Sequence, residues 1–170
     1  MWCTSGTWVG LGNPDPAAGA ASSVRLAIDR SAQFSVAYRD GAAAVQVKKL
    51  VGPSWQNVGP AVAANGQSLA LAFDESDNPC VAFADNSNGG RLTVARWTGV
   101  WTVAGGGPAS RAGVDYVSMG IDGSGTIYVA CEDLCAVRGL LRCLAGQRCL
   151  RHGPSRQHLA HRRRWRVLTR

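Results

Sequence analysis

The chain has 170 residues, of which 46% are apolar and 17% are charged. This composition is typical of a globular protein and excludes wholesale disorder, and the absence of an apolar stretch of 18 residues excludes a membrane-spanning helix. The formal net charge of +7 is unevenly distributed. All eleven acidic residues lie in 1–133 beside eight Lys and Arg, whereas residues 134–170 hold ten Arg and no acid.

The first 133 residues contain an internal repeat of 45 to 48 residues. Three windows align without a gap: VRLAIDRSAQFSVAYRD (24–40), LALAFDESDNPCVAFAD (69–85) and VSMGIDGSGTIYVACED (117–133). Six Asp residues hold equivalent places, an inner set of Asp29, Asp74 and Asp122 and a closing set of Asp40, Asp85 and Asp133. A Trp followed four residues later by Gly makes Trp8, Trp55 and Trp101 equivalent. This many coincidences indicates a repeat architecture.

Each complete unit predicts four antiparallel strands. In the first strand apolar residues alternate, as in Val24, Leu26 and Ile28, and a period of two is typical of β-structure. The turn-rich links RSAQ, ESDN and GSGT follow the inner Asp, whose carboxylate we expect to accept backbone amides in a hairpin. Second strands follow in FSVAY, PCVAF and IYVAC, and third strands in VQVKKL and LTVARW. A short fourth strand passes through Trp55 or Trp101.

Four short strands repeated every ~40–50 residues are typical of a β-propeller blade. The chain divides into a partial unit (1–21), two complete units (22–67 and 68–116) and a second partial unit (117–133). We therefore expect an all-β fold, a partial β-propeller of about three four-stranded blades, with an open β-solenoid as the alternative. Because closed propellers have about four to eight blades, either several chains assemble, or the chain is a fragment of something longer, or it is an open stack. The fragment interpretation is favoured, and exposed sheet edges invite self-association.

The units resemble the tandem repeats of secreted and cell-surface propeller proteins. The stretches that carry this resemblance are SVAYRD (35–40), VQVKKLVGPSWQNVG (45–59), VAFAD (81–85) and LTVARWTGVWTVAGG (92–106), and it covers about residues 6–133. The resemblance implies propeller architecture and favours an extracellular or cell-surface location, but it says almost nothing about a ligand. The residues after Met1 have neither the basic start nor the apolar run of a signal peptide, so the N-terminus does not support that location.

Residues 134–170 depart from the repeat at once. An acid-free mixture of Arg, Leu, Cys and His favours a frameshift or misjoined exon over a true domain, although both interpretations stay open. Residues 134–148 predict a short amphipathic helix, and the chain from Gly153 onward is predicted to be disordered. The apolar face of that helix would contain Leu134, Val137, Leu141 and Leu144. We therefore expect this Arg-rich tail to lie outside the fold.

No residue is assigned a catalytic, cofactor-binding or metal-binding role, and no cofactor is expected. Histidine occurs only in the tail, so the repeats contain no Ser/His/Asp or Cys/His arrangement. The turn that begins at Asp74 loosely resembles a calcium loop, but Pro79 stands where that loop needs Gly, and a hairpin explains it better. The spacing of the potential ligands in the tail does not match known zinc sites. They are Cys135, Cys143, Cys149, His152, His158 and His161. Disulfide pairing of the six Cys stays open.

The sequence favours a non-enzymatic binding or structural scaffold whose partner is an unknown protein or glycan. The alternative is a carbohydrate-active or lectin-like propeller, because indole rings can stack on sugars. The recurrence of Trp at one blade position favours blade-to-blade packing instead. A third hypothesis is a basic-tailed nucleic-acid or membrane-surface binder. Ten Arg would attract phosphates, but the tail has a single aromatic residue for stacking, Trp165, so a nucleic-acid partner is disfavoured.

Overall fold

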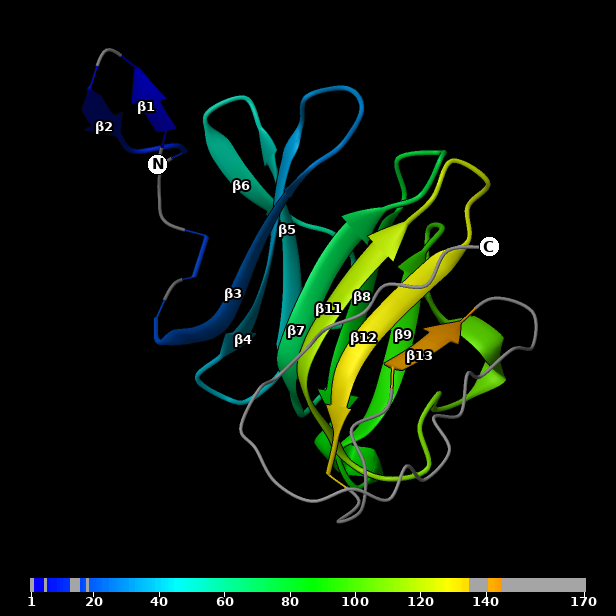
Figure 1. Cartoon of the computed structure of the whole chain (residues 1–170). Helices are drawn as coiled ribbons and strands as arrows, with labels where there is room; N and C mark the ends of the chain where they lie inside the picture. The colour runs from blue at the N-terminus through cyan, green and yellow to red at the C-terminus, as the bar shows by residue number, and fades with distance from the viewer. Residues whose placement is uncertain (1, 5, 13–15, 18, 135–140, 145–170) are drawn as a thin grey trace, which may run out of the picture.

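The fold is built from antiparallel β-sheets (Figure 1). This computed structural model describes residues 2–4, 6–12, 16–17, 19–134 and 141–144. Apart from strands, the regular elements in these ranges are two single-turn 3-10 segments, η1 (Asn86–Asn88) and η2 (Ala104–Gly106). In the same ranges, no helix has the length and apolar character that crossing a lipid bilayer requires. The expected all-β class is confirmed.

The two complete repeat units form two four-stranded sheets, called blade 1 and blade 2. Blade 1 consists of β3 (Ala21–Ile28), β4 (Phe34–Asp40), β5 (Val45–Val51) and β6 (Ser54–Asn57). Blade 2 consists of β7 (Gly66–Phe73), β8 (Pro79–Asp85), β9 (Arg91–Trp97) and β10 (Trp101–Val103). In both sheets each strand pairs antiparallel with its neighbour in the sequence, so the order in space follows the order along the chain.

The partial units form smaller sheets. β1 (Trp2–Thr4) pairs with β2 (Thr7–Val9), with Cys3 opposite Trp8, as Leu50 is opposite Trp55 in blade 1. The β1–β2 pair therefore corresponds to the outer half of a blade. At the other end, β11 (Val114–Ile121), β12 (Ile127–Asp133) and β13 (Leu141–Leu144) form a three-stranded sheet, called blade 3.

Strand β13 corrects the expectation for the Arg-rich tail. The sequence predicts a helix over 134–148 and an end of the fold at Asp133, but Leu141–Leu144 form a strand whose Leu141 lies opposite Ala130 of β12. The physical reason is that the edge of β12 presents backbone N–H and C=O groups, and an extended segment beside it satisfies them. Residues 135–140 and 145–170, with five of the six tail Cys and His considered for zinc, lie outside the described residues.

The three blades are stacked, with β7 between β3 and β11 (Figure 1). One apolar cluster fills the space between blades 1 and 2, and a second fills the space between blades 2 and 3. The buried members of the first are Ala37, Val45, Val47, Leu69, Val81, Phe83 and Ala95. Those of the second are Ala70, Cys80, Ala82, Ala84, Leu92, Val94, Val114, Val117, Ile127 and Val129. Because the sheets stack face to face and blade 2 is covered on both faces by its neighbours, the arrangement is that of an incomplete propeller.

The first strand of each of the three blades contains the same β-bulge. The register shifts between Ser22 and Arg25 in β3, and the shifts in β7 and β11 are at equivalent places. At the centre of each bulge a residue other than Gly has a positive φ, namely Ser23 (51°), Ser68 (52°) and Tyr116 (49°). A strained backbone geometry that recurs at one position in three units belongs to the repeat and not to one local sequence.

Candidate functional site

The inner Asp of each unit closes the hairpin between the first two strands. In all three units one carboxylate oxygen accepts hydrogen bonds from the backbone N–H groups two and four residues later, at 2.8 to 2.9 Å. The acceptors with their donors are Asp29 (Ser31, Gln33), Asp74 (Ser76, Asn78) and Asp122 (Ser124, Thr126). The residue that follows each Asp by three positions, Ala32, Asp77 or Gly125, has a left-handed φ. These carboxylates therefore serve their own turns.

The hydrogen bonds keep the inner Asp residues ionised. Burial would raise the pKa of Asp29, but hydrogen bonds from the Gln33 amide and from Lys49 outweigh it and lower the pKa. The Lys49 Nζ lies 3.2 Å from Asp29 Oδ2, and Arg96 Nε lies 3.5 Å from Asp74 Oδ2 at the equivalent place in blade 2. Hydrogen bonds from the Ser124 hydroxyl and the Thr126 amide lower the pKa of Asp122 to about 2. A carboxylate with a lowered pKa is a poor proton donor at neutral pH.

The closing Asp residues also act as backbone acceptors. Asp40 Oδ1 accepts from the N–H groups of Ala42 (3.0 Å) and Ala44 (2.9 Å) in the turn after β4. Asp85 Oδ1 accepts from the Ser87 N–H (3.0 Å) and caps η1. Asp133 ends β12, and its side chain lies outside the described part of the chain. In the described units, this position too has a structural role.

The repeated Trp ties its unit to the preceding one. Trp55 Nε1 donates to the Leu11 carbonyl (3.1 Å), and Trp101 Nε1 donates to the Val58 carbonyl (3.1 Å). Leu11 and Val58 are themselves equivalent, since each follows the Trp of its own unit by three residues. Trp55 and Trp101 are partly buried at matching places, whereas Trp8 is 67% exposed. Burial of this Trp is therefore supplied by the unit before it.

The Gly four residues after the Trp allows the next unit to approach. Gly12 and Gly59 have φ of +79° and +70°, which favours Gly. A Cβ on Gly12 would lie 2.5 Å from Trp55 Nε1, and one on Gly59 would lie 2.3 Å from Trp97 Cη2. The Trp-to-Gly spacing in the sequence thus marks a contact between units, and at Gly59 this contact places the Trp97 indole against blade 1.

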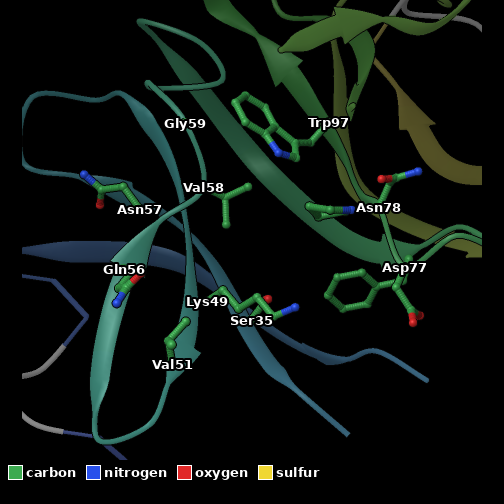
Figure 2. A pocket seen from close by; sticks show the side chains of 12 residues that line it. Ser35, Lys49, Val51, Gln56, Asn57, Val58, Gly59, Asp77, Asn78 and Trp97 are labelled. Atoms are coloured by element: carbon green, nitrogen blue, oxygen red, sulfur yellow. The ribbon is translucent and has the colours of Figure 1, made fainter. Parts of the chain in front are cut away.

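A pocket of about 320 Å³ lies between blades 1 and 2, at the end where the β7–β8 hairpin turns (Figure 2). Its blade 1 wall includes Ser35, Lys49 and Val58, and its blade 2 wall includes Phe73, Asn78 and Trp97. Further polar lining comes from Gln56, Asn57 and Asp77. Figure 2 shows Trp97 and Asn78 across the pocket from Val58, Lys49 and Ser35. The site therefore combines one indole face with amide, hydroxyl and ammonium groups.

The Ser35 side chain stands out among the polar groups of this pocket. Ser35 is 0% exposed, and in the described part of the chain its hydroxyl has no hydrogen-bond partner. Its neighbours are held in place, because Lys49 is paired with Asp29 and the Asn78 Nδ2 donates to Asp74 Oδ2 (3.1 Å). A buried hydroxyl without a partner is costly, and in a pocket it points to a ligand.

Sequence reasoning singled out the repeated residues and missed those of the pocket. The signal that could have found them is a departure of one unit from its own repeat. Ser35 stands where blade 2 has Cys80, Trp97 where blade 1 has Leu50, and Asn57 where blade 2 has Val103. Positions that must be equivalent for stacking are kept in every unit, whereas a binding site needs side chains that the other units do not share.

Comparisons with known proteins assign no family. No protein-family model matches the sequence, and no curated protein matches it. Among solved structures, the fold is similar to that of a fucose lectin from Kordia zhangzhouensis in complex with methyl-fucoside, with a TM-score of 0.43 and 13% sequence identity over 66% of this chain and 85% of that chain. At this level the similarity identifies neither a family nor a ligand, so the site must be interpreted from its own geometry.

Proposed function

We propose that this protein is a non-enzymatic binding scaffold and that the pocket between blades 1 and 2 takes a small polyhydroxylated ligand, such as one saccharide ring. The observation that carries this proposal is the buried, unpartnered hydroxyl of Ser35 in a pocket that also contains the Trp97 indole. A sugar ring has an apolar C–H face, which can lie against the Trp97 indole, and a rim of hydroxyl groups, which can bond to the polar groups of the pocket.

The Ser35 hydroxyl needs a partner that can both donate and accept. Leaving a buried polar group without one costs about 1–3 kcal/mol, and a ligand hydroxyl removes that cost when it binds. The surrounding amides of Asn78, Asn57 and Gln56 and the Lys49 ammonium offer donors, and the amides also offer acceptors. This mixture fits the several hydroxyl groups of a sugar better than an apolar ligand or a single anion.

The aromatic wall and the size of the pocket support the same ligand class. The Trp97 ring is fixed, because it packs over Gly59 and lies 5.3 Å from the Trp101 ring, measured between centroids. A rigid indole provides a flat apolar surface at little entropic cost. The volume of about 320 Å³ is at the lower end of small-molecule sites, which span roughly 300–1,000 Å³. It suits one ring better than an extended oligosaccharide.

The described lining of this pocket contains one carboxylate, Asp77, which supports binding rather than hydrolysis. Most glycoside hydrolases use two carboxyl groups on either side of the scissile bond. Asp77 is a carboxylate of the described lining, and it already accepts hydrogen bonds from the Arg30 N–H (3.0 Å) and the Ser31 hydroxyl (3.3 Å) of blade 1. Asp77 therefore joins the two blades at the edge of the pocket and does not form an acid and base pair with a neighbour there.

A glycan array followed by calorimetry with the selected monosaccharide tests this proposal. Trp97→Leu takes the residue that blade 1 has at the equivalent place, so it removes the indole while keeping a residue that the repeat accepts. We expect Trp97→Leu and Ser35→Ala each to weaken binding by at least about tenfold, which corresponds to ~1.4 kcal/mol. Trp8→Leu is the matched control, since Trp8 is exposed and lies outside the pocket lining.

Three outcomes contradict the proposal. A protein that retains no glycan on the array does not bind saccharides with useful affinity. A glycan whose binding survives Trp97→Leu but is lost in Trp8→Leu occupies another site. Slow hydrolysis of a bound aryl glycoside by the native protein, abolished by Asp77→Asn, would show an enzyme in place of a binding scaffold.

A further inference from the structure

The front face of blade 1 is apolar and uncovered at its first strand. We call the face of a blade that meets the preceding unit its front face and the opposite one its back face. Val24, Leu26 and Ile28 lie on the front face of β3 and are 53%, 56% and 55% exposed. Val24 corresponds to Leu69 in blade 2 and to Val117 in blade 3. These two residues are 0% and 4% exposed. The rest of the row is partly buried in those two blades, at Leu71, Phe73, Met119 and Ile121, whereas in blade 1 the whole row is exposed.

The N-terminal residues cover only the outer part of this front face. Trp55 donates to the Leu11 carbonyl, and the Tyr38 hydroxyl donates to the Pro16 carbonyl at 3.0 Å. Val36 and Tyr38 on β4 are accordingly buried, whereas β3 is not. The β1–β2 pair corresponds to the outer half of a blade, which fits this partial cover of blade 1. The first two strands of another blade would be needed to cover β3.

The back face of blade 3 is the surface that such an interface requires. Ala37 and Ala82 are 0% exposed because the following blade covers them, and their equivalent in β12, Ala130, is only half-buried. Ser118 on β11 is exposed, although its equivalent in blade 2, Ala70, belongs to the core between blades 2 and 3. The inner strands of blade 3 thus offer a back face with no following blade among the described residues. This face also contains the exposed Tyr128 and Glu132, which stand where blade 2 has the core residues Cys80 and Ala84.

We propose that the open front face of β3 in blade 1 binds the back face of the inner strands β11 and β12 of blade 3 in a second copy of this chain. The contact would repeat the stacking that the structure already shows between blades 1 and 2 and between blades 2 and 3. Because it joins two different faces, it is head to tail, and contacts of this kind build closed rings when the rotation allows. Two copies of three blades give six, which lies within the range of about four to eight found in closed propellers. The interface is distinct from the pocket between blades 1 and 2.

The mass of this 170-residue chain in solution is the first test. Native mass spectrometry and light scattering at micromolar concentration should give twice the chain mass of 17.9 kDa. A monomer at these concentrations overturns the proposal, and so does an open series of larger polymers, because the ring would then not close. Association only with another protein, with no dimer in the purified sample, would assign the face to a different partner and overturn it as well.

Charged substitutions on the two faces then test the head-to-tail geometry. Leu26→Lys on the front face and Ser118→Glu on the back face each replace an exposed residue, so each chain should still fold, which circular dichroism checks. Each variant alone should lose at least 100-fold in dimer affinity. Val100→Lys is the matched control, because Val100 is an exposed apolar residue on the turn between β9 and β10 and should leave the dimer unchanged.

An equimolar mixture of the two variants separates this arrangement from its alternatives. In the mixed pair one interface is native and the other joins Lys to Glu, so the heterodimer should return while each variant alone stays monomeric. A front-to-front dimer predicts instead that Ser118→Glu dimerises normally and that mixing restores nothing. If Ser118→Glu does not disturb the dimer but Ala130→Glu does, mixing Ala130→Glu with Leu26→Lys repeats the test. Failure of both mixtures to form a dimer overturns the proposal.

Discussion

At the scale of single residues, the repeated polar side chains organise the backbone. The inner Asp accepts two backbone amides in each hairpin, and Asp40 does the same after β4. Each Asp accepts hydrogen bonds from the backbone N–H groups two and four residues after it. One Asp at the right place in the sequence is therefore enough to close the turn. Ser35 and Trp97, to which we assign ligand binding, are residues that the other blades do not have at the equivalent positions.

Replacing Asp122 by Asn should make the fold less sensitive to acid. The pKa of Asp122 is lowered to about 2, below the ~3.9 of an unfolded Asp. Its charge therefore stabilises the folded state above about pH 4, and that stabilisation is lost as the pH falls from about 4 through 2. Asn keeps an acceptor oxygen for the Ser124 and Thr126 amides but cannot titrate.

Urea unfolding at several pH values measures this effect. The free energy of unfolding of Asp122→Asn should fall less steeply between about pH 4 and 2 than that of the native protein. Glu75→Gln is the control, because Glu75 is exposed and the amides that close its hairpin donate to Asp74 instead. An unchanged slope for Asp122→Asn, or an equal change for Glu75→Gln, would show that the turn carboxylate does not govern acid stability.

Removing the indole N–H of Trp101 should weaken the contact between blades 1 and 2. Trp101→Phe keeps an aromatic ring but leaves the Val58 and Pro60 carbonyls without this donor. We expect a loss of about 1–2 kcal/mol in the free energy of unfolding. Trp8→Phe, at the equivalent but exposed position, should change stability by no more than about 0.5 kcal/mol. Equal losses for the two variants would refute the role assigned to the blade-to-blade hydrogen bond.

At the scale of elements, the units are joined by close approach at fixed points of the repeat. The Trp-to-Gly spacing places a Gly with positive φ at positions 12, 59 and 105, and a side chain of the following unit lies against each of the first two. Gly12 meets Trp55 and Gly59 meets Trp97 in this way. The bulge in each first strand is a second feature shared by all three units. Both features set how one sheet stacks on the next.

The pair Gly59 and Gly52 separates the cost of backbone strain from the cost of crowding. Both have positive φ, but a Cβ would strike Trp97 at Gly59, whereas at Gly52 it would meet nothing within 4 Å. Gly52→Ala should therefore cost about 1–2 kcal/mol for the left-handed backbone. Gly59→Ala should cost about 1–3 kcal/mol more, because Trp97 must move. Urea unfolding of the two variants checks this, and equal costs would mean that Trp97 shifts without resistance.

At the scale of the whole molecule, blade 2 has stacked neighbours on both faces and the two end blades do not. In a stacked repeat each unit is stabilised mainly by its direct neighbours. The front of β3 and the back of β11 and β12 are therefore the surfaces to which we assign the proposed contact between two copies. The pocket between blades 1 and 2 includes Ser35, Asn57 and Trp97, which differ from their repeat partners, and this is where we place the ligand.

Much of this architecture follows from sequence patterns of short range. The alternation in the first strands, the Asp-closed hairpins and the four strands per unit depend on residues within a few positions of each other. Two or more aligned copies make such patterns easy to detect. The helix expected over 134–148 is wrong at Leu141–Leu144 for a related reason, since an amphipathic spacing records a local preference and not the nearby open edge of β12.

The tertiary structure decided what depends on neighbouring units. Val24 and Leu69 have the same pattern around them, yet one is exposed and the other is core, because burial is supplied by whichever blade lies in front. Trp8 and Trp101 differ for the same reason. The pocket joins Ser35 to Trp97 across two sheets, and no local pattern connects residues so far apart in the chain. Local interactions select strands and turns, whereas surfaces and sites arise where separate units meet.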